Sequence, residues 1–189
     1  MNVPFREDFG KLLNELNLNG VGIEIGVAQA NYSEILLTTT KLSNIYFVDP
    51  WKEYPQAIYN DSTNCSQAKQ DARYAAVVEK LKKYNNAHIL RQDSIEALSS
   101  FSDEFFDFIY IDANHAYEYV KIDVNNWYPK LKKGGVFAGH DYFDGTTKHG
   151  VYGVKSAVDE FCKTKNIIPL VTGGTRRCPA SWYFIKGAE

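Results

Sequence analysis

Acidic residues recur at the ends of the apolar runs of this chain. Glu24, Asp49, Asp93 and Asp112 each close such a run, and Asp141 closes a fifth. In an open parallel sheet the carboxyl ends of the strands share one edge, and ligands bind outside that edge. Five carboxylates there favour a crevice for a ligand with hydroxyl, amine or cationic groups. Capping of the following helix is the alternative for any single one of them.

A glycine turn follows the first apolar run, GVGIEIGVAQA at residues 20–30. Gly26 breaks this run and allows the backbone to approach a ligand closely. Asp49 lies about two dozen residues further on, where a nucleotide-binding fold places a carboxylate on a ribose diol. A dinucleotide fingerprint needs two more glycines to seat a pyrophosphate, but Ala28 and Asn31 follow Gly26 here. The pattern therefore favours an adenosyl ligand over NAD.

Alternating strand and helix periodicities predict the fold that positions these residues. Strands are expected at residues 21–25, 45–48, 88–90, 106–111, 134–140, 167–172 and 181–185. Helices are expected at residues 5–18, 31–40, 74–85, 95–98, 117–131 and 154–161. We predict one α/β domain over residues 1–189, with its N-terminal helix within residues 1–19. Its architecture would be a Rossmann-like three-layer αβα sandwich around a mainly parallel seven-stranded sheet with an antiparallel last strand.

Composition limits the possible partners. The chain has 189 residues, 44% hydrophobic and 23% charged, as expected for a globular domain. A net charge of -2 argues against electrostatic binding to nucleic acid or an anionic membrane. Cys65, Cys162 and Cys178 are far apart and odd in number, which indicates free thiols in a reduced, cytoplasmic setting. No apolar run is long enough for a membrane span or a signal core.

The chain resembles class I S-adenosylmethionine-dependent methyltransferases over nearly its whole length. EIGVAQA is similar to the first motif of that family, FVDPW to the ribose-binding motif and RQDS to the motif beside the adenine amine. IDANHAYEYVKID and GGVFAGHDY resemble I-D-x-x-H-x-Y-x-x-V-x-x-D and G-G-x-x-x-x-H-D-Y of a small bacterial subgroup linked to O-methylation of sugars and other small molecules. Ala28 and Ala30 replace later glycines of the first motif, and a negative φ at Ala28 would accommodate the change.

The resemblance implies residues for the methionine part of S-adenosylmethionine. Glu24 would approach the ammonium group, and Gly26 and Val27 would line the methionine segment. Asp112 would stand near the methionine part or the point of methyl transfer.

It also implies residues for the adenosine part. Asp49 would hold the ribose hydroxyls, and Asp93 would accept a hydrogen bond from the adenine amino group with Ser94 beside it. Trp51 would pack on the adenosine face, or alternatively serve only the core.

Two histidines are candidates for catalysis. A hydroxyl acceptor must lose its proton, and histidine suits that task near neutral pH. His115 is our first choice for general base or acceptor alignment, with Asp112 nearby, and His140 is expected to orient; a structural role is the alternative for each. Asp112, Asp141 and His140 also match a site that holds a divalent cation in some O-methyltransferases. Carboxylates favour Mg²⁺ and an imidazole favours Mn²⁺, and metal dependence is left open.

Two segments are expected to be loops on the acceptor side, residues 52–66 and 143–150. Candidates for contact with a small-molecule acceptor are Tyr54, Tyr59, Tyr142, Arg176 and Arg177. Tyrosines offer stacking faces and hydroxyl donors, whereas solvation is the favoured interpretation of the two arginines. The sequence thus predicts methyl transfer to a small-molecule hydroxyl by a chain that is a possible homo-oligomer. A non-catalytic S-adenosylmethionine-binding adaptor and an NAD-dependent oxidoreductase are the alternatives.

Overall fold

A single seven-stranded sheet organises the computed structural model, which describes residues 2–56, 58–59, 61, 63–174 and 178–187. The strands are β1 Val21–Ile25, β2 Asn44–Val48, β3 Ala87–Leu90, β4 Phe106–Ile111, β5 Leu131–Gly139, β8 Leu170–Val171 and β9 Trp182–Ile185. They lie in the order β3-β2-β1-β4-β5-β9-β8. Strands β1 to β5 pair in parallel, and β9 runs antiparallel to β5 and β8. This confirms the predicted mainly parallel sheet with an antiparallel last strand; Arg176 and Arg177 lie outside the described residues.

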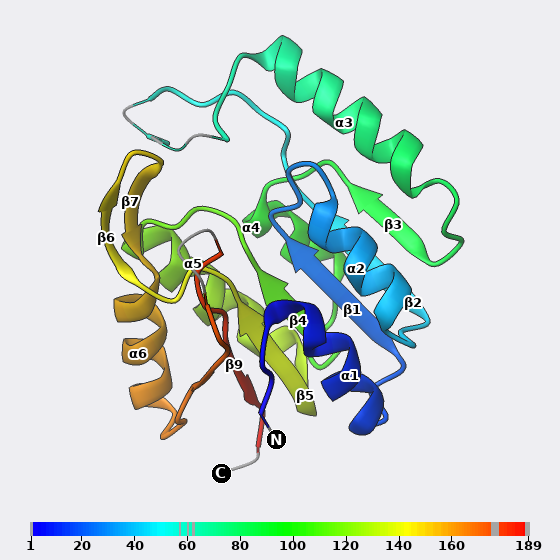
Figure 1. Ribbon diagram of the computed structural model, residues 1–189, viewed down its shortest axis with the longest axis vertical. Coiled ribbons are helices and arrows are strands. Elements are labelled where there is room, and N and C mark those ends of the chain that lie inside the picture. Colours follow the sequence, from blue (N-terminus) through cyan, green and yellow to red (C-terminus); the bar gives the residue numbers. More distant parts are fainter. Residues whose placement is uncertain (1, 57, 60, 62, 175–177, 188–189) are drawn as a thin grey trace.

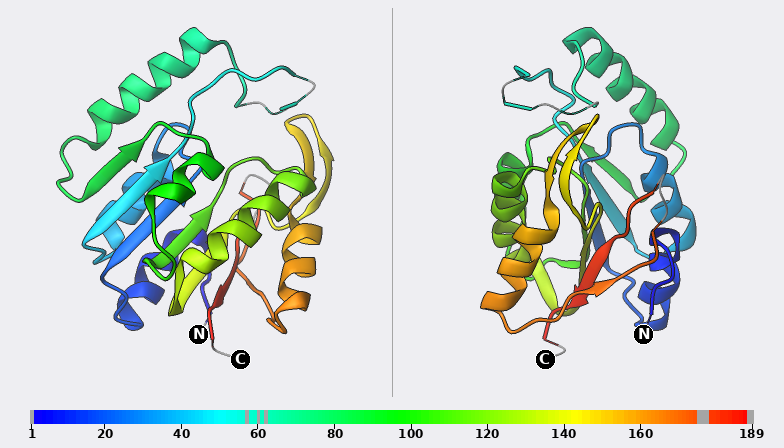
Figure 2. Two further views of the ribbon diagram at one scale, coloured as in Figure 1. Left: turned by 180° about the vertical axis from the view of Figure 1, so that it is seen from behind. Right: turned by 60° about the vertical axis from the view of Figure 1, so that its left-hand side comes forward.

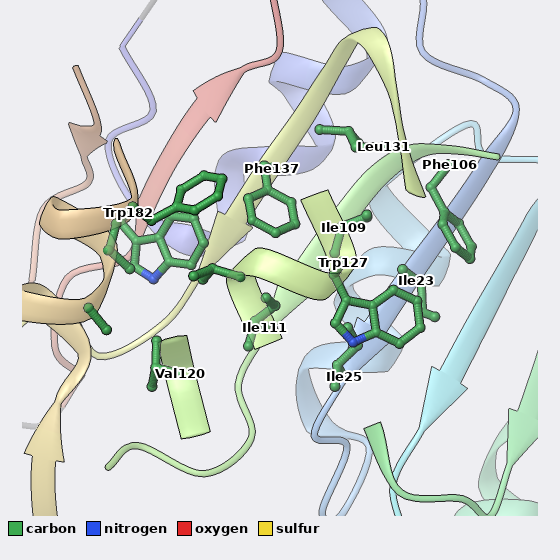
Figure 3. Packing of buried hydrophobic residues seen from close by; sticks show 14 of the residues in the cluster. Ile23, Ile25, Phe106, Ile109, Ile111, Val120, Trp127, Leu131, Phe137 and Trp182 are labelled. Carbon is green, nitrogen blue, oxygen red and sulfur yellow. The ribbon is translucent and has the colours of Figure 1, made fainter. Parts of the chain in front are cut away.

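Helices cover both faces of the sheet (Figures 1 and 2). The helices are α1 Phe9–Glu15, α2 Asn31–Thr39, α3 Gln67–Leu81, α4 Ser94–Ala97, α5 Tyr117–Trp127 and α6 Val154–Thr164. Short 3-10 helices are η1 Arg6–Asp8, η2 Leu98–Ser100 and η3 Tyr128–Lys130. One hydrophobic cluster joins the sheet to α1, α2 and α3, and a second joins it to α5 and α6. In the second, Ile23 and Ile25 of β1 lie in the same cluster as Trp127 of α5 (Figure 3). The three predicted layers are therefore present.

Helix α5 ends earlier than expected. It stops at Trp127, a 3-10 turn contains Pro129, and β5 already begins at Leu131. Proline has no N–H for the helical hydrogen bond and its ring crowds the preceding turn, which explains the stop. Gly134 has a φ of +83° as a helix-ending glycine would, but it lies inside β5.

The expected loop at residues 143–150 is a β-hairpin instead. Its strands are β6 Asp144–Thr147 and β7 Gly150–Gly153, joined across a two-residue turn between Thr147 and Gly150. Every residue of β6 is exposed, so the segment has no apolar alternation from which a strand is predicted. The described part of residues 52–66 holds no helix or strand. It lies next to this hairpin, beyond the carboxyl ends of the central strands (Figures 1 and 2).

Within the described part of the chain, no helix combines the length and the apolar character that crossing a bilayer would require.

Candidate active site

A cavity of about 570 Å³ opens at the carboxyl edge of the sheet. Its volume lies in the range of small-molecule sites. Four of the five acidic residues line it, each from a different strand end: Glu24, Asp49, Asp93 and Asp112. Other lining residues come from the glycine turn, the 52–66 segment, η1 and α5. The sheet therefore brings together the carboxylates that the sequence placed at one edge.

The turn after β1 has the conformation of a glycine loop. Gly26 has a φ of +89°, and a Cβ there would lie 2.0 Å from the carbonyl oxygen of Asp112. Ala28 and Ala30 also adopt left-handed conformations, with φ of +47° and +57°. The negative φ that would accommodate Ala28 is therefore not found, and the turn has a different shape. Each left-handed alanine costs about 1 kcal/mol, so the surrounding contacts must hold the loop in place.

Asp49 supplies those contacts. Its Oδ2 accepts hydrogen bonds from the backbone N–H groups of Val27 and Ala28, at 3.0 and 2.9 Å. Its Oδ1 accepts one from the backbone N–H of Trp51 at 2.7 Å. A carboxylate has about four acceptor positions, so this side chain holds the loop and retains capacity toward the cavity.

Trp51 does not offer a face to the cavity, which corrects the expectation that it packs on adenosine. Its side chain is 1% exposed and is not among the lining residues. The indole N–H donates to the carbonyl oxygen of Ala28 at 2.9 Å, and the ring contacts Tyr74 of α3. The Trp51 side chain therefore connects the glycine turn to α3 through one hydrogen bond and one ring contact.

Glu24 is a buried carboxyl at the end of β1. It is 2% exposed, and the hydroxyl of Ser33 donates to its Oε2 at 2.5 Å. Burial raises the pKa of Glu24 to about 8, and the nearby carboxylate of Asp112 adds to the rise. An ammonium group beside this buried carboxyl would favour its ionised form.

A chain of hydrogen bonds lies at the other end of the cavity. The indole N–H of Trp127 donates to the hydroxyl of Ser94 at 2.8 Å, and that hydroxyl donates to Asp123 at 2.6 Å. Asp93 caps α4, accepting from the N–H of Ile95 at 3.1 Å. Asp123 lines the cavity but has no role in the sequence prediction. Its place as the last acidic residue of the subgroup motif is the signal that could have identified it.

Replacing Asp123 with asparagine should change how stability depends on pH. Burial raises the pKa of Asp123 to about 7, against about 3.9 in an unfolded chain. The folded state therefore binds this proton more tightly, and stability falls as pH rises from about 4 to 7. We expect Asp123→Asn to raise the free energy of unfolding by about 2–4 kcal/mol at pH 8 and to leave it nearly unchanged at pH 4.

Urea unfolding at both pH values measures this difference. The exposed Asp103→Asn is the matched carboxyl-to-amide control, since Asp103 forms a surface ion pair with Lys130. An equal effect of Asp123→Asn at pH 4 and pH 8 would contradict the assignment.

His115 lies at the centre of a carboxylate cluster. Its Nε2 lies 2.9 Å from Asp141 Oδ2 and 3.4 Å from Asp112 Oδ1. Its Nδ1 is buried, lies 3.5 Å from Asp61 Oδ2 and has no hydrogen-bond partner among the described residues. On its face, Tyr152 of β7 stacks with a centroid distance of 4.7 Å. The predicted catalytic and metal sets do not contain Asp61 or Tyr152. Asp61 lies within the expected loop at residues 52–66, and Tyr152 lies just after the expected loop at residues 143–150, so neither was placed near His115.

The carboxylates around His115 raise its pKa. Burial by itself lowers the pKa of His115, but the carboxylates of Asp112, Asp141 and Asp61 outweigh it and raise the pKa well above 6.5. An imidazole that already carries a proton cannot accept one from an acceptor hydroxyl. In the absence of a cation this arrangement fits alignment of an acceptor, whereas a general base or a metal ligand needs Nε2 without its proton.

The same cluster is a candidate metal site. Asp112, His115 and Asp141 can each present one ligand atom, and these atoms lie within 4.8 Å of one another. The donor set of two carboxylates and one imidazole suits Mg²⁺ or Mn²⁺. If Nε2 of His115 binds the ion, Nδ1 faces Asp61, and histidine ligands commonly direct their second nitrogen to a carboxylate.

His140 is not part of this set, so the set differs from the predicted ligand trio. Its Nδ1 lies 3.2 Å from Asp141 Oδ1 and 3.9 Å from Asp112 Oδ1, and its Nε2 lies 3.7 Å from the sulfur of Cys178. The backbone turns at Asp141, where φ is +55°, and the position of the third donor is taken by His115. His140 thus contacts Asp141 beside the cluster, where an orienting role fits.

The sequence profile of a methyltransferase domain family matches residues 21–142, more than half of the chain. The chain belongs to this methyltransferase family. The match includes all five predicted strand-end acids and leaves η1 and the β6–β7 hairpin outside. Membership of a methyltransferase family argues against an NAD-dependent oxidoreductase and supports a methyltransferase that uses S-adenosylmethionine.

Solved structures share the fold of the methyltransferase. An O-methyltransferase from Bacillus cereus in complex with S-adenosylhomocysteine has a TM-score of 0.63 at 12% identity, over 95% of this chain and 80% of that one. A protein assigned as a caffeoyl-CoA O-methyltransferase from Staphylococcus aureus has a TM-score of 0.66 at 16% identity, over 95% and 81%. Fibrillarin from Aeropyrum pernix, with natively bound S-adenosylmethionine, has a TM-score of 0.53 at 14% identity, over 86% and 64%.

One curated sequence relative, the uncharacterized protein y4gI of Sinorhizobium fredii, is 38% identical over 55 residues. The matched part is 29% of the methyltransferase and 6% of that protein. The methyltransferase therefore spans a small part of the length of this relative.

Proposed function

We propose that this methyltransferase transfers the methyl group of S-adenosylmethionine to a hydroxyl group of a small molecule. We further propose that Asp112, His115 and Asp141 hold a divalent cation, Mg²⁺ or Mn²⁺. The observation that carries the proposal is the cluster of two carboxylates and one imidazole, of which Asp112 and His115 line the cavity. A divalent cation lowers the pKa of a hydroxyl bound to it.

The remaining lining residues position the methyl donor. Its sulfonium methyl group is already activated, so the main tasks of the protein are alignment and exclusion of water. Glu24 and Gly26 suit the methionine part, and Asp49 keeps the glycine turn in shape with acceptor capacity left for the ribose hydroxyls. Asp93 and Ser94 suit the adenine at the other end of the cavity.

The acceptor is proposed to lie between the 52–66 segment and the β6–β7 hairpin. Tyr54 and Tyr59 line the cavity from the first segment, and Tyr152 stacks on His115 from the second. Aromatic faces with hydroxyl groups suit a sugar or a phenol. The O-methyltransferase from Bacillus cereus with the same fold supports a hydroxyl acceptor. A net charge of -2 argues against a nucleic acid.

Formation of S-adenosylhomocysteine tests the proposal. The enzyme is incubated with S-adenosylmethionine and a panel of sugars and phenols, with Mg²⁺, with Mn²⁺ or with excess chelator. We expect acceptor-dependent turnover with a divalent cation and a loss of at least about 100-fold in chelator.

Full turnover in chelator would contradict the cation site while leaving methyl transfer intact. Binding of S-adenosylmethionine without turnover on any acceptor would instead favour a non-catalytic adaptor.

A further inference from the structure

A cationic side chain enters the cavity from the N-terminal segment. Arg6 belongs to η1, outside the part of the chain that the family profile matches, and it is one of the lining residues. Its side chain is 18% exposed. The sequence prediction assigned it no role, because an arginine in an N-terminal helical segment is usually a solvated surface residue.

The structure holds Arg6 firmly in this position. The hydroxyl of Tyr32, in the first turn of α2, donates to the carbonyl oxygen of Arg6 at 3.0 Å. The guanidinium carbon lies 4.5 Å from the centroid of the Tyr32 ring. Just before it, the carbonyl oxygen of Pro4 accepts from the N–H of Gly173 at 2.6 Å. These contacts fix both the backbone and the direction of the side chain before any ligand binds.

The guanidinium has donors to spare. Among the described residues its one hydrogen bond is to Asp112 Oδ2, at 3.4 Å. This distance is well beyond the 2.7–2.9 Å or so of a strong charge-assisted pair, and Glu7 Oε1 lies further away, at 4.0 Å. A guanidinium carries five N–H groups in a planar fork that matches a carboxylate. A mostly buried arginine with so few bonds is ready to bind an anionic group.

The surrounding charges indicate which anion. Glu24, Asp112 and Gly26 line the same cavity as Arg6, and the carboxyl of Glu24 suits an ammonium group. The amino-acid end of S-adenosylmethionine carries an ammonium and a carboxylate on one carbon. An acid and an arginine that line the same cavity complement both charges.

We propose that Arg6 binds the carboxylate of the amino-acid end of S-adenosylmethionine and so selects the intact cofactor over fragments without that end. This inference rests on the proposed placement of the methionine part beside Glu24.

Two ligands separate this role from a general effect on the cavity. S-adenosylhomocysteine has the carboxylate, whereas 5′-methylthioadenosine keeps the adenosine and sulfur but lacks the amino-acid end. We expect Arg6→Gln to weaken binding of S-adenosylhomocysteine about 30-fold or more, measured by calorimetry, because hydrogen bonds to a charged group are lost. Binding of 5′-methylthioadenosine should change less than about threefold. Lys11→Gln, on the exposed face of α1, is the control and should alter neither.

Arg6→Lys gives a second route if the glutamine variant does not fold. Lysine keeps the charge without the planar fork. Arg6→Lys should therefore also weaken binding of S-adenosylhomocysteine more than binding of 5′-methylthioadenosine, but by a smaller factor. Equal weakening of both ligands, or unchanged binding of S-adenosylhomocysteine with a raised KM for the acceptor, would overturn the inference. Failure of the unmodified enzyme to bind either ligand would count against the cofactor site itself, a distinct result.

Discussion

Asp49→Ala is expected to weaken the binding of S-adenosylhomocysteine at least about 100-fold. The substitution removes three hydrogen bonds from backbone N–H groups, those of Val27, Ala28 and Trp51. Hydrogen bonds to a charged acceptor contribute about 1.5–3 kcal/mol each. Without them, little opposes the preference of Ala28 for a right-handed or extended backbone. The turn should then leave the shape that the cofactor needs, and calorimetric titration measures the loss.

The free energy of unfolding should fall in the same variant by about 2–4 kcal/mol, less than the sum of three such bonds, because N–H groups beside the cavity can bond to water instead. Asp49→Asn is the informative companion, because one amide oxygen can still accept from Val27 and Ala28 while the amide nitrogen cannot accept from Trp51. It should lie between the wild type and the alanine variant in both measurements. Asp103→Ala, on the surface, serves as the control for loss of a carboxylate. Unchanged affinity in Asp49→Ala would remove Asp49 from the cofactor site.

Much of the fold could be predicted because its central strands are short and apolar, and β1, β2 and β4 are each followed by a glycine or an acid. Residues 21–25 and 106–111 were predicted with the bounds that β1 and β4 have, since a central parallel strand is apolar on both faces. The β6–β7 hairpin could not be predicted in this way. Its strand β6 is exposed throughout, so no burial pattern distinguishes it from a loop.

The convergence of the acids could be predicted, whereas the histidine that completes the candidate metal cluster could not. Strand ends fix where Glu24, Asp49, Asp93 and Asp112 lie, whereas His115 and His140 both stand near the same edge in sequence. In the structure His115 approaches Asp141 with Nε2 and His140 approaches it with Nδ1, a difference that spacing in the sequence does not show.

Residues that reach the site from a distance were missed for a related reason. In the sequence, His115 is separated by 54 residues from Asp61, by 37 from Tyr152 and by 109 from Arg6. Separations of this size do not reveal whether two residues are close in the fold. Trp51 was instead placed at the cofactor although it belongs to the core, because a large aromatic residue beside a binding motif can serve in either place. Burial, which sequence does not reveal, decides between the two.

Asp141→Asn is expected to lower turnover at least about 100-fold while the affinity for S-adenosylhomocysteine changes less than about threefold. Asp141 lies 2.9 Å from Nε2 of His115 but does not line the cofactor cavity. Its loss of charge should therefore weaken cation binding without disturbing the adenosyl ligand. Asparagine suits this position because it tolerates the left-handed backbone that Asp141 adopts, with a φ of +55°. The variant thus isolates the charge from the shape of the turn.

The dependence of turnover on Mn²⁺ concentration gives the decisive measurement. The half-saturating concentration should rise about tenfold or more in Asp141→Asn, because one anionic ligand is replaced by a neutral one. Asp141→Ala should be worse in both turnover and stability, since alanine tolerates a positive φ less well. A variant that loses turnover with an unchanged Mn²⁺ response would show that Asp141 acts through His115 alone. The cluster would then align the acceptor by hydrogen bonds, and the cation would have no place in it.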